Sequence, residues 1–284
     1  MDGILLANKP KGPTSHDIIF DIRRKFGIKK TGHTGTLDPL AEGLMIILVG
    51  QATKISPYMH FSKEYEIGVL FGKSTETDDL EGTQVRECPV PKRLKEKAAE
   101  ILPEFTGVLR QTPPVFSAVK KDGKKLYNLA RRGKEVNAEP RSVEIFNIDI
   151  TGVEGNTVFL RVHASAGTYM RSIARDMGER LGSCAVLSQI KRTRIGGFCL
   201  KDAKRPEELT DIKENLISID SALYNMPGIE INENDEKKIR NGMSVALPLP
   251  GNSNIVKLVR NGKVIAIGEV KGAEILVKRG IELF

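Results

Sequence analysis

The sequence predicts an α+β protein with one large domain and a small β-rich module at its carboxyl end. Both segments with the two-residue period of strands and amphipathic segments of helical period occur along the chain. After residue 225 the pattern changes to short strands around a single helix. The 284 residues, of which 40% are hydrophobic, suffice for two such units. We therefore expect one domain over 1–225 and a second over 226–284.

The amino-terminal part is predicted to hold two buried strands around a helix. Residues 3–8 are predicted to form a short buried strand, and residues 44–49 are a continuous apolar run, which is typical of one. The turn that ends at Ser15 supplies a helix N-cap, and the apolar helix face that follows ends at Gly27, a natural helix stop.

The remaining elements follow from periodicity and turn residues. Tyr65, Ile67 and Val69 stand two residues apart, as on one face of a strand. The turn Arg260-Asn261-Gly262-Lys263 is a strong two-residue hairpin signal. In order, the sequence predicts helices at 51–60, 94–102, 124–132, 170–181, 184–190 and 235–240, and strands at 65–71, 143–150, 158–162, 195–200, 243–247, 254–259, 264–270 and 274–278.

Composition excludes several classes of protein. No apolar run approaches the ~18 residues of a transmembrane helix, and the first residues lack a secretory signal, so we expect a cytoplasmic protein without a membrane partner. Cys88, Cys184 and Cys199 lie far apart in the sequence and are expected to be reduced thiols. Neither the cysteines nor the four histidines show zinc-ligand spacing, so no metal is expected.

The excess of basic residues is concentrated in one segment. The formal net charge of the chain is +8. From Arg110 to Arg141, nine lysines and arginines stand against three acidic residues. A solvated helix face is one explanation, but such a cluster favours nucleic-acid binding. We expect a clamp-like insertion at about 112–141.

The stretch 32–43 places a single carboxylate, that of Asp38, among glycines. Glycine lets backbone and substrate come close, but no lysine follows as in a phosphate-binding loop. On its residues alone, the stretch is either an ordinary loop with a turn-forming aspartate or a catalytic loop. Arg171 stands in the first turn of a predicted helix, where a cation opposes the helix dipole, so it is either a surface arginine or the partner of a specific acidic group. Together with a basic arm, these features suit an enzyme that acts on an extruded nucleobase.

The chain as a whole resembles the TruB family of bacterial tRNA pseudouridine-55 synthases. Five motifs occur in the order of that family: Asn8-Lys9-Pro10-Lys11-Gly12-Pro13-Thr14-Ser15, Gly32-His33-Thr34-Gly35-Thr36-Leu37-Asp38-Pro39-Leu40-Ala41-Glu42-Gly43, Lys63-Glu64-Tyr65, Gln111-Thr112-Pro113-Pro114-Val115-Phe116-Ser117-Ala118 and Gly167-Thr168-Tyr169-Met170-Arg171-Ser172. The resemblance implies a pseudouridine-synthase fold, which is a mixed, mainly antiparallel sheet flanked by helices and loops with an RNA-gripping insertion. It also implies a small β-rich PUA-like domain at the carboxyl end.

The resemblance assigns expected roles to individual residues. Asp38 matches the catalytic aspartate, Tyr65 the tyrosine that stacks on the target base, and Arg171 the arginine that pairs with the aspartate. Tyr169 matches a wall of the active site, and Ile190 would line the base pocket. The expected RNA contacts are His33, Lys9, Lys120, Lys121, Lys124, Lys125, Arg131 and Arg132.

Two of these positions need comment. His33 matches the histidine that inserts into the T-loop and fills the space left by the flipped nucleotide. The pair Ile190-Lys191 departs from the Leu-Arg usual in the family. Isoleucine can line a base pocket as leucine does, whereas lysine lacks the planar fork with which arginine holds phosphate.

The activity that the resemblance implies is the isomerisation of uridine 55 in the T-loop of tRNA to pseudouridine. The C1′–N1 bond breaks, the uracil turns and the C1′–C5 bond forms, so no cofactor or metal is needed. The expected partner is tRNA, bound by a monomer, with the T-arm on the large domain and the acceptor stem on the small one. Two alternatives stay open, a guide-RNA-dependent synthase and a non-catalytic tRNA-binding or folding chaperone.

Overall fold

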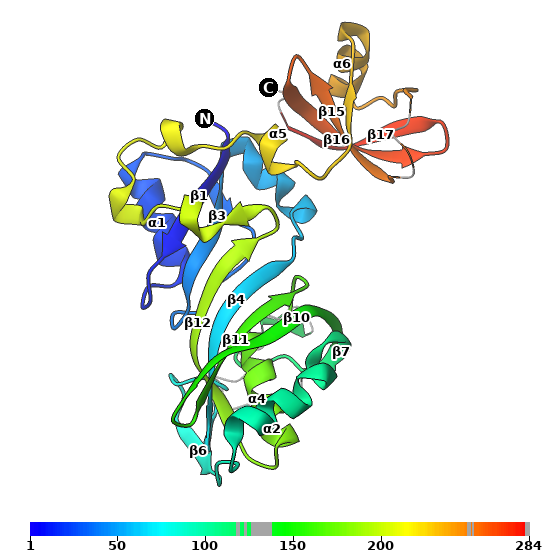
Figure 1. The fold of residues 1–284 in the computed structure, drawn as a ribbon. Coiled ribbons are helices and arrows are strands. Elements are labelled where there is room, and N and C mark those ends of the chain that lie inside the picture. Colours follow the sequence, from blue (N-terminus) through cyan, green and yellow to red (C-terminus); the bar gives the residue numbers. More distant parts are fainter. Residues whose placement is uncertain (118–119, 122–123, 126–137, 249–250, 252, 282–284) are drawn as a thin grey trace.

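One long sheet forms the body of the protein (Figure 1). The computed structural model describes residues 1–117, 120–121, 124–125, 138–248, 251 and 253–281. The sheet follows the order β1-β3-β12-β4-β11-β10-β7, with β2 attached to β3 and β13 attached to β12. Its strands are β1 Gly3–Lys9, β2 Thr31–His33, β3 Glu42–Val49, β4 Lys63–Phe71, β7 Gly107–Gln111, β10 Arg141–Glu154, β11 Thr157–Ala164, β12 Ala185–Ile195 and β13 Phe198–Cys199.

Within this long sheet, neighbouring strands are antiparallel except at one point. There β12 runs parallel to β3 over two residue pairs, one of which joins Arg192 to Gly43. The sheet is therefore mixed but mainly antiparallel, and with its helices it confirms the predicted α+β class. The remaining strand pairs are β5 Lys73–Thr75 with β6 Gln84–Glu87, and β8 Lys120–Lys121 with β9 Lys124–Lys125.

Helices cover the sheet at both of its ends. The α-helices are α1 Ser15–Lys25, α2 Leu94–Ile101, α4 Met170–Arg180, α5 Ile219–Ala222 and α6 Glu233–Arg240, and the 3₁₀ helices are Gly50–Tyr58, Leu102–Phe105, Leu200–Asp202, Pro206–Glu208 and Lys213–Asn215. The helix α1 is confirmed, but its N-cap is Thr14 and not Ser15: Thr14 and Asp17 form a capping box, and Ile18 and Ile22 face the core. Within the described residues, no helix is both long and apolar enough to cross a membrane.

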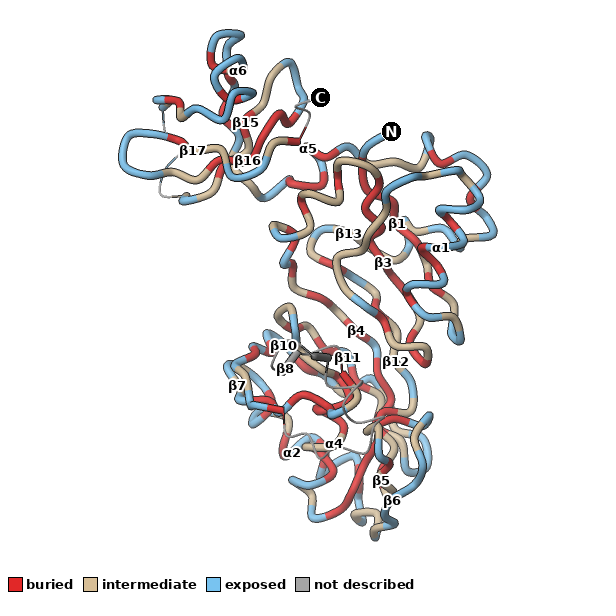
Figure 2. Tube along the Cα trace, turned by 180° about the vertical axis from the view of Figure 1, so that it is seen from behind, coloured by how far each residue is buried: buried red, intermediate tan, exposed pale blue. Residues whose placement is uncertain are grey.

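The long strands β4 and β12 join two separately packed halves of the large unit. One half packs α2 and α4 against β4, β10 and β11, and the other packs α1 and the 3₁₀ helix Gly50–Tyr58 around β1 and β3. Figure 2 shows runs of buried residues along these strands. Because β4 and β12 are shared, segments on the two halves are held at a fixed distance across the middle of the sheet.

The structure corrects the prediction of a helix at 184–190. This segment lies in β12, paired along β4 and joined to β3. Its pairing with β4 shifts register between Leu187 and Gln189 and again between Arg192 and Arg194. Such bulges interrupt the two-residue period, which is why the strand pattern was hidden. The predicted strand at 195–200 is also wrong, since the chain turns at Gly196 and Gly197 into β13.

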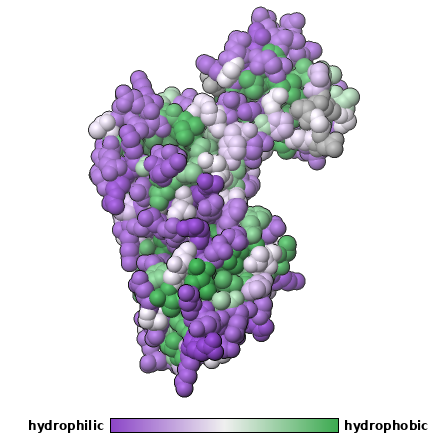
Figure 3. Space-filling model, viewed as in Figure 1, coloured by the Kyte–Doolittle hydropathy of each residue, from purple (hydrophilic) through white to green (hydrophobic). Residues whose placement is uncertain are grey.

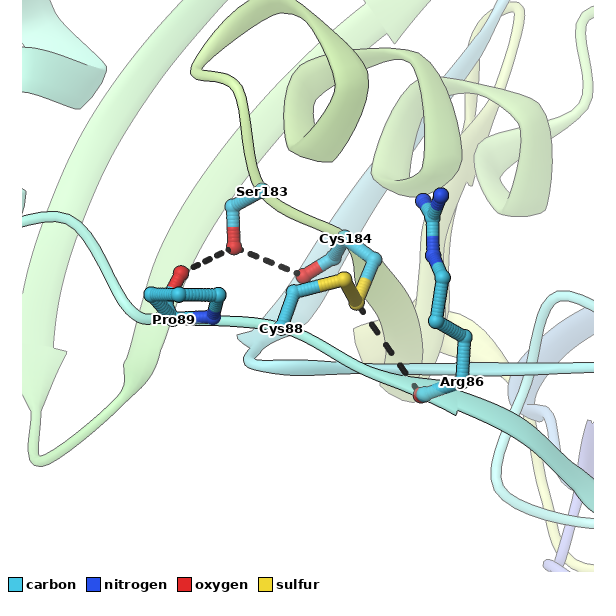
Figure 4. The surroundings of a disulfide bond; sticks show 5 residues. All are labelled: Arg86, Cys88, Pro89, Ser183 and Cys184. Atoms are coloured by element: carbon cyan, nitrogen blue, oxygen red, sulfur yellow. Dashed lines mark hydrogen bonds between the residues drawn. A yellow bond between two sulfur atoms is a disulfide. The ribbon is translucent and has the colours of Figure 1, made fainter.

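The expectation of three reduced cysteines is wrong for two of them. Cys88 and Cys184 form a disulfide across a sequence separation of 96 residues, and only Cys199 is a free thiol. Figure 4 shows this bond beside Ser183, whose hydroxyl donates to the carbonyl oxygen of Pro89 at 2.7 Å. The fold brings the chain after β6 against the start of β12, a proximity that sequence spacing could not reveal.

A four-stranded sheet follows in the carboxyl-terminal part, with the order β14-β15-β16-β17. Its strands are β14 Gly228–Glu230, β15 Ile255–Arg260, β16 Lys263–Lys271 and β17 Glu274–Gly280. The predicted hairpin at Asn261-Gly262 is confirmed, since both residues have positive φ. Val264, Ile267 and Ile281 pack into one cluster with Ile219 and Ala222 of the larger unit. The division at residue 225 and the PUA-like character of this sheet remain predictions.

The basic insertion is only partly described. The backbone of β8 and β9 pairs Lys120 with Lys125 and Lys121 with Lys124, so the predicted helix does not begin at Lys124. The rest of that helix lies outside the described residues. On the face shown in Figure 3 the surface is mostly hydrophilic, with an apolar area around β10 and β11; Val108 of β7 and Phe146 of β10 are exposed large hydrophobic residues.

The close approach of β3 and β12 requires glycine at position 43. Gly43 has φ +108°, and a β-carbon there would clash with the backbone carbonyl oxygen of Arg192. We expect Gly43→Ala to lower the free energy of unfolding by the ~1–3 kcal/mol of backbone strain plus a further ~1–3 kcal/mol of overpacking. The measurement is urea denaturation.

The matched control is Gly12→Ala. Gly12 has a similar φ of +111° but no atom within 4 Å of an added β-carbon, so it carries the strain without the clash. Equal losses in the two variants would show that the contact with Arg192 is not what restricts position 43.

Candidate active site

A cavity of about 870 Å³ lies across β4 and β12 and contains residues from all five sequence motifs. Its walls come from the loop before β3, the loop after β5, the segment at Phe116 and the start of α4. Among the residues that the structure describes, four buried polar atoms in these walls have no hydrogen-bond partner: His33 Nδ1, Thr34 Oγ1, Ser117 Oγ and Arg171 Nε. Buried polar groups are normally satisfied, so these atoms indicate a site prepared for a polar ligand.

Asp38 and Arg171 face each other in this cavity. A guanidinium nitrogen of Arg171 lies 2.9 Å from a carboxylate oxygen of Asp38. The Arg171 side chain is 6% exposed, whereas that of Asp38 is 42% exposed. The carboxylate is therefore held from behind by a buried cation and remains open to the cavity in front.

Three further contacts fix the guanidinium of Arg171. It donates to the carbonyl oxygens of Thr77 and Phe116, both at 3.0 Å, and lies 3.6 Å from the carboxylate of Asp79, which is also buried. Arg171, a cation in the first turn of a helix, thus has two acidic partners, the carboxylates of Asp38 and Asp79. Because one arginine contacts three separate loops, its position ties the start of α4 to both halves of the site.

The loop that carries Asp38 is anchored by buried side chains. The hydroxyl of Ser15 both accepts from the amide of Leu37 and donates to its carbonyl oxygen, each at 2.8 Å. The ammonium of Lys9 donates to the carbonyl oxygens of Ala41 at 2.6 Å, Pro10 at 3.0 Å and Pro39 at 3.3 Å. Both sides of Asp38 are therefore fixed through the backbone, and its carboxylate is left free for the cavity.

Lys9 is not placed to make the RNA contact that was predicted for it. Its residue is 0% exposed and all of its hydrogen bonds go to backbone carbonyls. Burial lowers the pKa of Lys9 to about 8, an effect that the carboxylate of Asp38 opposes. No surface remains for an RNA contact, and we assign this lysine to holding the loop.

Arg192 supports the same loop from the β12 side. It is almost fully buried, and its guanidinium donates to the carbonyl oxygens of Leu44 at 2.8 Å, Gly35 at 3.1 Å and Thr36 at 3.5 Å. It also lies beside the hydroxyl of Tyr65. Burial raises the pKa of the Tyr65 hydroxyl and Arg192 acts in the opposite direction, so the ring at the cavity wall is a neutral phenol at pH 7.

The other predicted pocket residues also line the cavity. Tyr169 is the N-cap residue of α4, and its backbone exchanges two hydrogen bonds with the side chain of Gln111. The guanidinium of Arg141 lies 4.7 Å from the centre of the Tyr169 ring. Ile190 lies on β12, packs against the hydrophobic cores of both halves of the large unit, and is half-buried. Burial lowers the pKa of His33, with Arg192 and His16 acting in the same direction, so this imidazole is neutral at pH 7.

A family profile described as "TruB family pseudouridylate synthase (N terminal domain)" matches residues 23–170. Over 282 residues the chain is 38% identical to "tRNA pseudouridine synthase B" of Caldanaerobacter subterraneus subsp. tengcongensis, an alignment that spans 98% of this chain and 99% of the relative. The chain belongs to the TruB family.

Two further comparisons agree with this assignment. The protein of the same name from Oceanobacillus iheyensis is 41% identical over 283 residues, 94% of this chain and 92% of the relative. Among solved structures, one described as "Crystal Structure of a Cbf5-Nop10-Gar1 Complex" aligns with a TM-score of 0.76 at 23% identity, over 98% of this chain and 84% of that one. The structural likeness at this identity shows the fold, which is that of the pseudouridine synthases.

Several residues of this TruB-family site were missed in the sequence. Asp79 lies in the polar loop 74–82, to which we gave no role, although four acidic residues stand there. Lys63 belongs to a quoted motif but was passed over for Tyr65. Arg192 follows Ile190-Lys191, the pair that differs from the family. Nothing in the pattern of hydrophobic residues shows that this arginine is buried. Lys191 itself lies at the surface, 3.7 Å from Glu42.

The side chains of the expected RNA contacts in the insertion lie outside the part of the chain that the structure describes. Lys120, Lys121, Lys124 and Lys125 are described by their backbone pairing, while Arg131 and Arg132 lie outside the described residues. Their contacts with RNA remain a prediction from charge and from the family motifs. Among the described residues, no group of three or more His, Cys, Asp or Glu side chains could hold a metal ion.

The three carbonyl contacts of Arg192 predict that lysine cannot replace it. The contacts of Arg192 come from three different nitrogens, Nε to Leu44, Nη1 to Thr36 and Nη2 to Gly35, and the one nitrogen of a lysine at this position cannot reproduce that spread. We expect Arg192→Lys to lower the free energy of unfolding by ~2–4 kcal/mol, since buried carbonyls lose their donors.

The matched control is Arg194→Lys on the same strand. Arg194 is about half exposed and makes one ion pair with Glu64 at 3.6 Å, so its change should stay within ~0.5 kcal/mol. Both variants are compared by urea denaturation. A loss below 1 kcal/mol for Arg192→Lys would contradict the anchoring role.

Proposed function

We infer that the chain is a stand-alone tRNA pseudouridine synthase, an isomerase that converts uridine 55 in the T-loop to pseudouridine. One observation carries this proposal: a carboxylate open to the cavity is paired with a buried arginine. The curated relatives at 38–41% identity over nearly the whole chain are named for the same activity. This activity would explain why the cavity holds an open carboxylate beside a buried arginine.

Asp38 is the residue that acts on the target nucleotide. The ionised carboxylate can serve as nucleophile or base, and Arg171 stabilises the charge while leaving the front of the group open. In the reaction the C1′–N1 bond breaks, the uracil turns, C1′–C5 forms, and the proton on C5 leaves while N1 gains one. Atoms therefore balance without a cofactor.

Base flipping is supported by the neutral ring of Tyr65. Extruding a nucleotide costs a few kcal/mol of unstacking, and stacking on an aromatic ring returns ~1–3 kcal/mol. Tyr65 is 7% exposed on the wall of the cavity, with Ile190 and Tyr169 as further walls. His33, a neutral ring on the same cavity, would fill the space that the nucleotide leaves in the RNA.

The finer features of tRNA binding extend this proposal. The basic insertion at 112–141 would grip the T-arm, and the PUA-like sheet would contact the acceptor stem. We place the protein in the cytoplasm as a monomer, in keeping with its action on tRNA.

The two alternatives are less well supported. A guide-RNA-dependent synthase is not favoured, because the relatives at about 40% identity are named tRNA pseudouridine synthase B. A chaperone that only binds tRNA would gain nothing from Asp38, since a carboxylate open to the cavity repels RNA phosphate.

The central test is tritium release from tRNA labelled at C5 of uridine, without any guide RNA. Wild-type protein should release one tritium per tRNA, because C5 loses its hydrogen when C1′–C5 forms. Asp38→Asn should reduce the rate by at least ~10⁴-fold, as expected when the reacting group is removed, while binding of a T-arm stem-loop stays within about threefold.

Two outcomes would overturn the assignment. Release by Asp38→Asn at the wild-type rate would remove Asp38 from the chemistry. Wild-type protein that binds free tRNA but converts none in a single turnover would favour the chaperone or the guided enzyme.

A separate test concerns the basic insertion. Replacing Lys120, Lys121, Lys124 and Lys125 by glutamate should weaken T-arm binding and flatten its dependence on salt, since each phosphate contact contributes about 0.7–0.9 to the slope of log affinity against log salt. Binding is measured between 50 and 200 mM salt. A slope equal to that of the wild type would exclude these lysines from the contact.

A further inference from the structure

Lys63 is a buried cation without a counter-ion among the described residues. It lines the cavity, is 9% exposed, and its one recorded hydrogen bond is to the carbonyl oxygen of Phe61 at 3.5 Å. A buried ammonium destabilises a protein unless it is paired or fully hydrogen-bonded. Burial lowers the pKa of Lys63 to about 8, and the nearby cation Arg192 acts in the same direction. The folded protein thus holds a charge that its own described groups do not satisfy.

Lys9 in the same site shows what a structural lysine does. It is even more deeply buried, at 0% exposed, but its ammonium donates to three carbonyl oxygens, the shortest at 2.6 Å. Lys63 makes one long contact instead. The difference indicates that Lys63 is not placed to hold the backbone and that its remaining donors are available to a ligand.

The position of Lys63 relative to Tyr65 suits a nucleotide. The two residues stand two apart on β4 and both line the cavity, so their side chains share a face about 7 Å apart along the strand. The backbone of Lys63 is paired with Ala164 on one side and Ile195 on the other. The side chain of Lys63 therefore extends from a rigid strand, and its backbone lies at a fixed distance from that of Tyr65, whose ring would hold the base.

Charge is distributed unevenly along the cavity. One end holds the carboxylates of Asp38 and Asp79 around Arg171. Around Gly35 the charges are positive, because a β-carbon added there would lie 3.6 Å from Cε of Lys63 and 3.7 Å from Nη1 of Arg192. A nucleotide has the matching asymmetry, since its base is uncharged and its phosphate is an anion.

We propose that Lys63 binds an RNA backbone phosphate next to the flipped uridine and so orients the nucleotide with its base toward Asp38. The proposal rests on the proposed function and adds a phosphate-binding site to it. The phosphate supplies the counter-ion that the free protein lacks, through a charge-assisted hydrogen bond in a partly desolvated site.

A double-mutant cycle between protein and RNA tests this contact. Binding is measured in an Asp38→Asn background, so that RNA is not converted, with T-arm stem-loops that carry one neutral methylphosphonate linkage on the 5′ or 3′ side of the target uridine. Lys63→Met should weaken binding of native RNA roughly tenfold or more. One of the two neutral linkages should weaken binding to the Lys63-containing protein by a similar factor and have no effect on Lys63→Met. Lys63→Arg, which keeps the charge, should recover most of the affinity.

Controls separate this role from a structural one. Lys97→Met removes a charge from the exposed face of α2 and should leave the affinity within about twofold. In urea denaturation without RNA, Lys63→Met should be at least as stable as the parent, whereas Lys9→Met should be less stable because three carbonyls lose their donor.

Three results would overturn the proposal: unchanged affinity for Lys63→Met, losses that simply add at both linkages, or a destabilised Lys63→Met whose weaker binding is not recovered by arginine. The tritium assay on wild-type protein reports the proposed function separately. Absence of turnover there would leave the binding cycle interpretable, so the two ideas can fail independently.

Discussion

The site depends on one constraint, which is that the loop carrying Asp38 turns several backbone carbonyls inward, away from water. Each needs a donor from the protein. Lys9, Ser15 and Arg192 supply these donors from three separate elements. Because the backbone is fixed by them, the carboxylate of Asp38 needs no local hydrogen bond of its own to hold the loop. In an ordinary turn the aspartate carboxylate would itself hold the backbone through a local hydrogen bond. Here the buried cations hold the backbone instead.

The same constraint explains why the sheet is mixed. Arg192 can reach the loop only because β12 lies directly against β3, and the single parallel step between them brings its backbone onto Gly43. The glycines of this stretch thus have different tasks. Gly43 allows two strands to approach, while Gly35 offers a carbonyl oxygen to Arg192 and borders Lys63. Local conformation, strand pairing and site geometry are therefore set together by a few positions.

Local signals in the sequence predicted much of the fold. The helix α1 and the hairpin at Asn261-Gly262 have signals within a few residues of themselves, in capping and turn chemistry. The strand β12 was misread because its bulges break the two-residue period. The disulfide was missed because its cysteines meet only in the folded chain.

The same difference between local and long-range signals decided which residues of the site could be predicted. Arg171 was identifiable because a cation at the start of a helix is unfavourable without a partner. Lys63 and Arg192 were not, since a buried cation looks like any surface cation in a sequence. The role of Lys9 was misjudged for the same reason, because a motif fixes a residue type but not whether water reaches it. Long-range contacts decide burial, and a single sequence does not record them.

The disulfide between Cys88 and Cys184 changes the topology of the molecule. It closes a covalent ring that includes β7, the basic insertion, β10, β11 and α4. A single backbone cut anywhere inside this ring, including one in the insertion, leaves both pieces joined through the sulfur bridge. While the bridge is oxidised, the half of the site that carries Arg171 cannot dissociate from the half that carries Asp38 after one such cleavage.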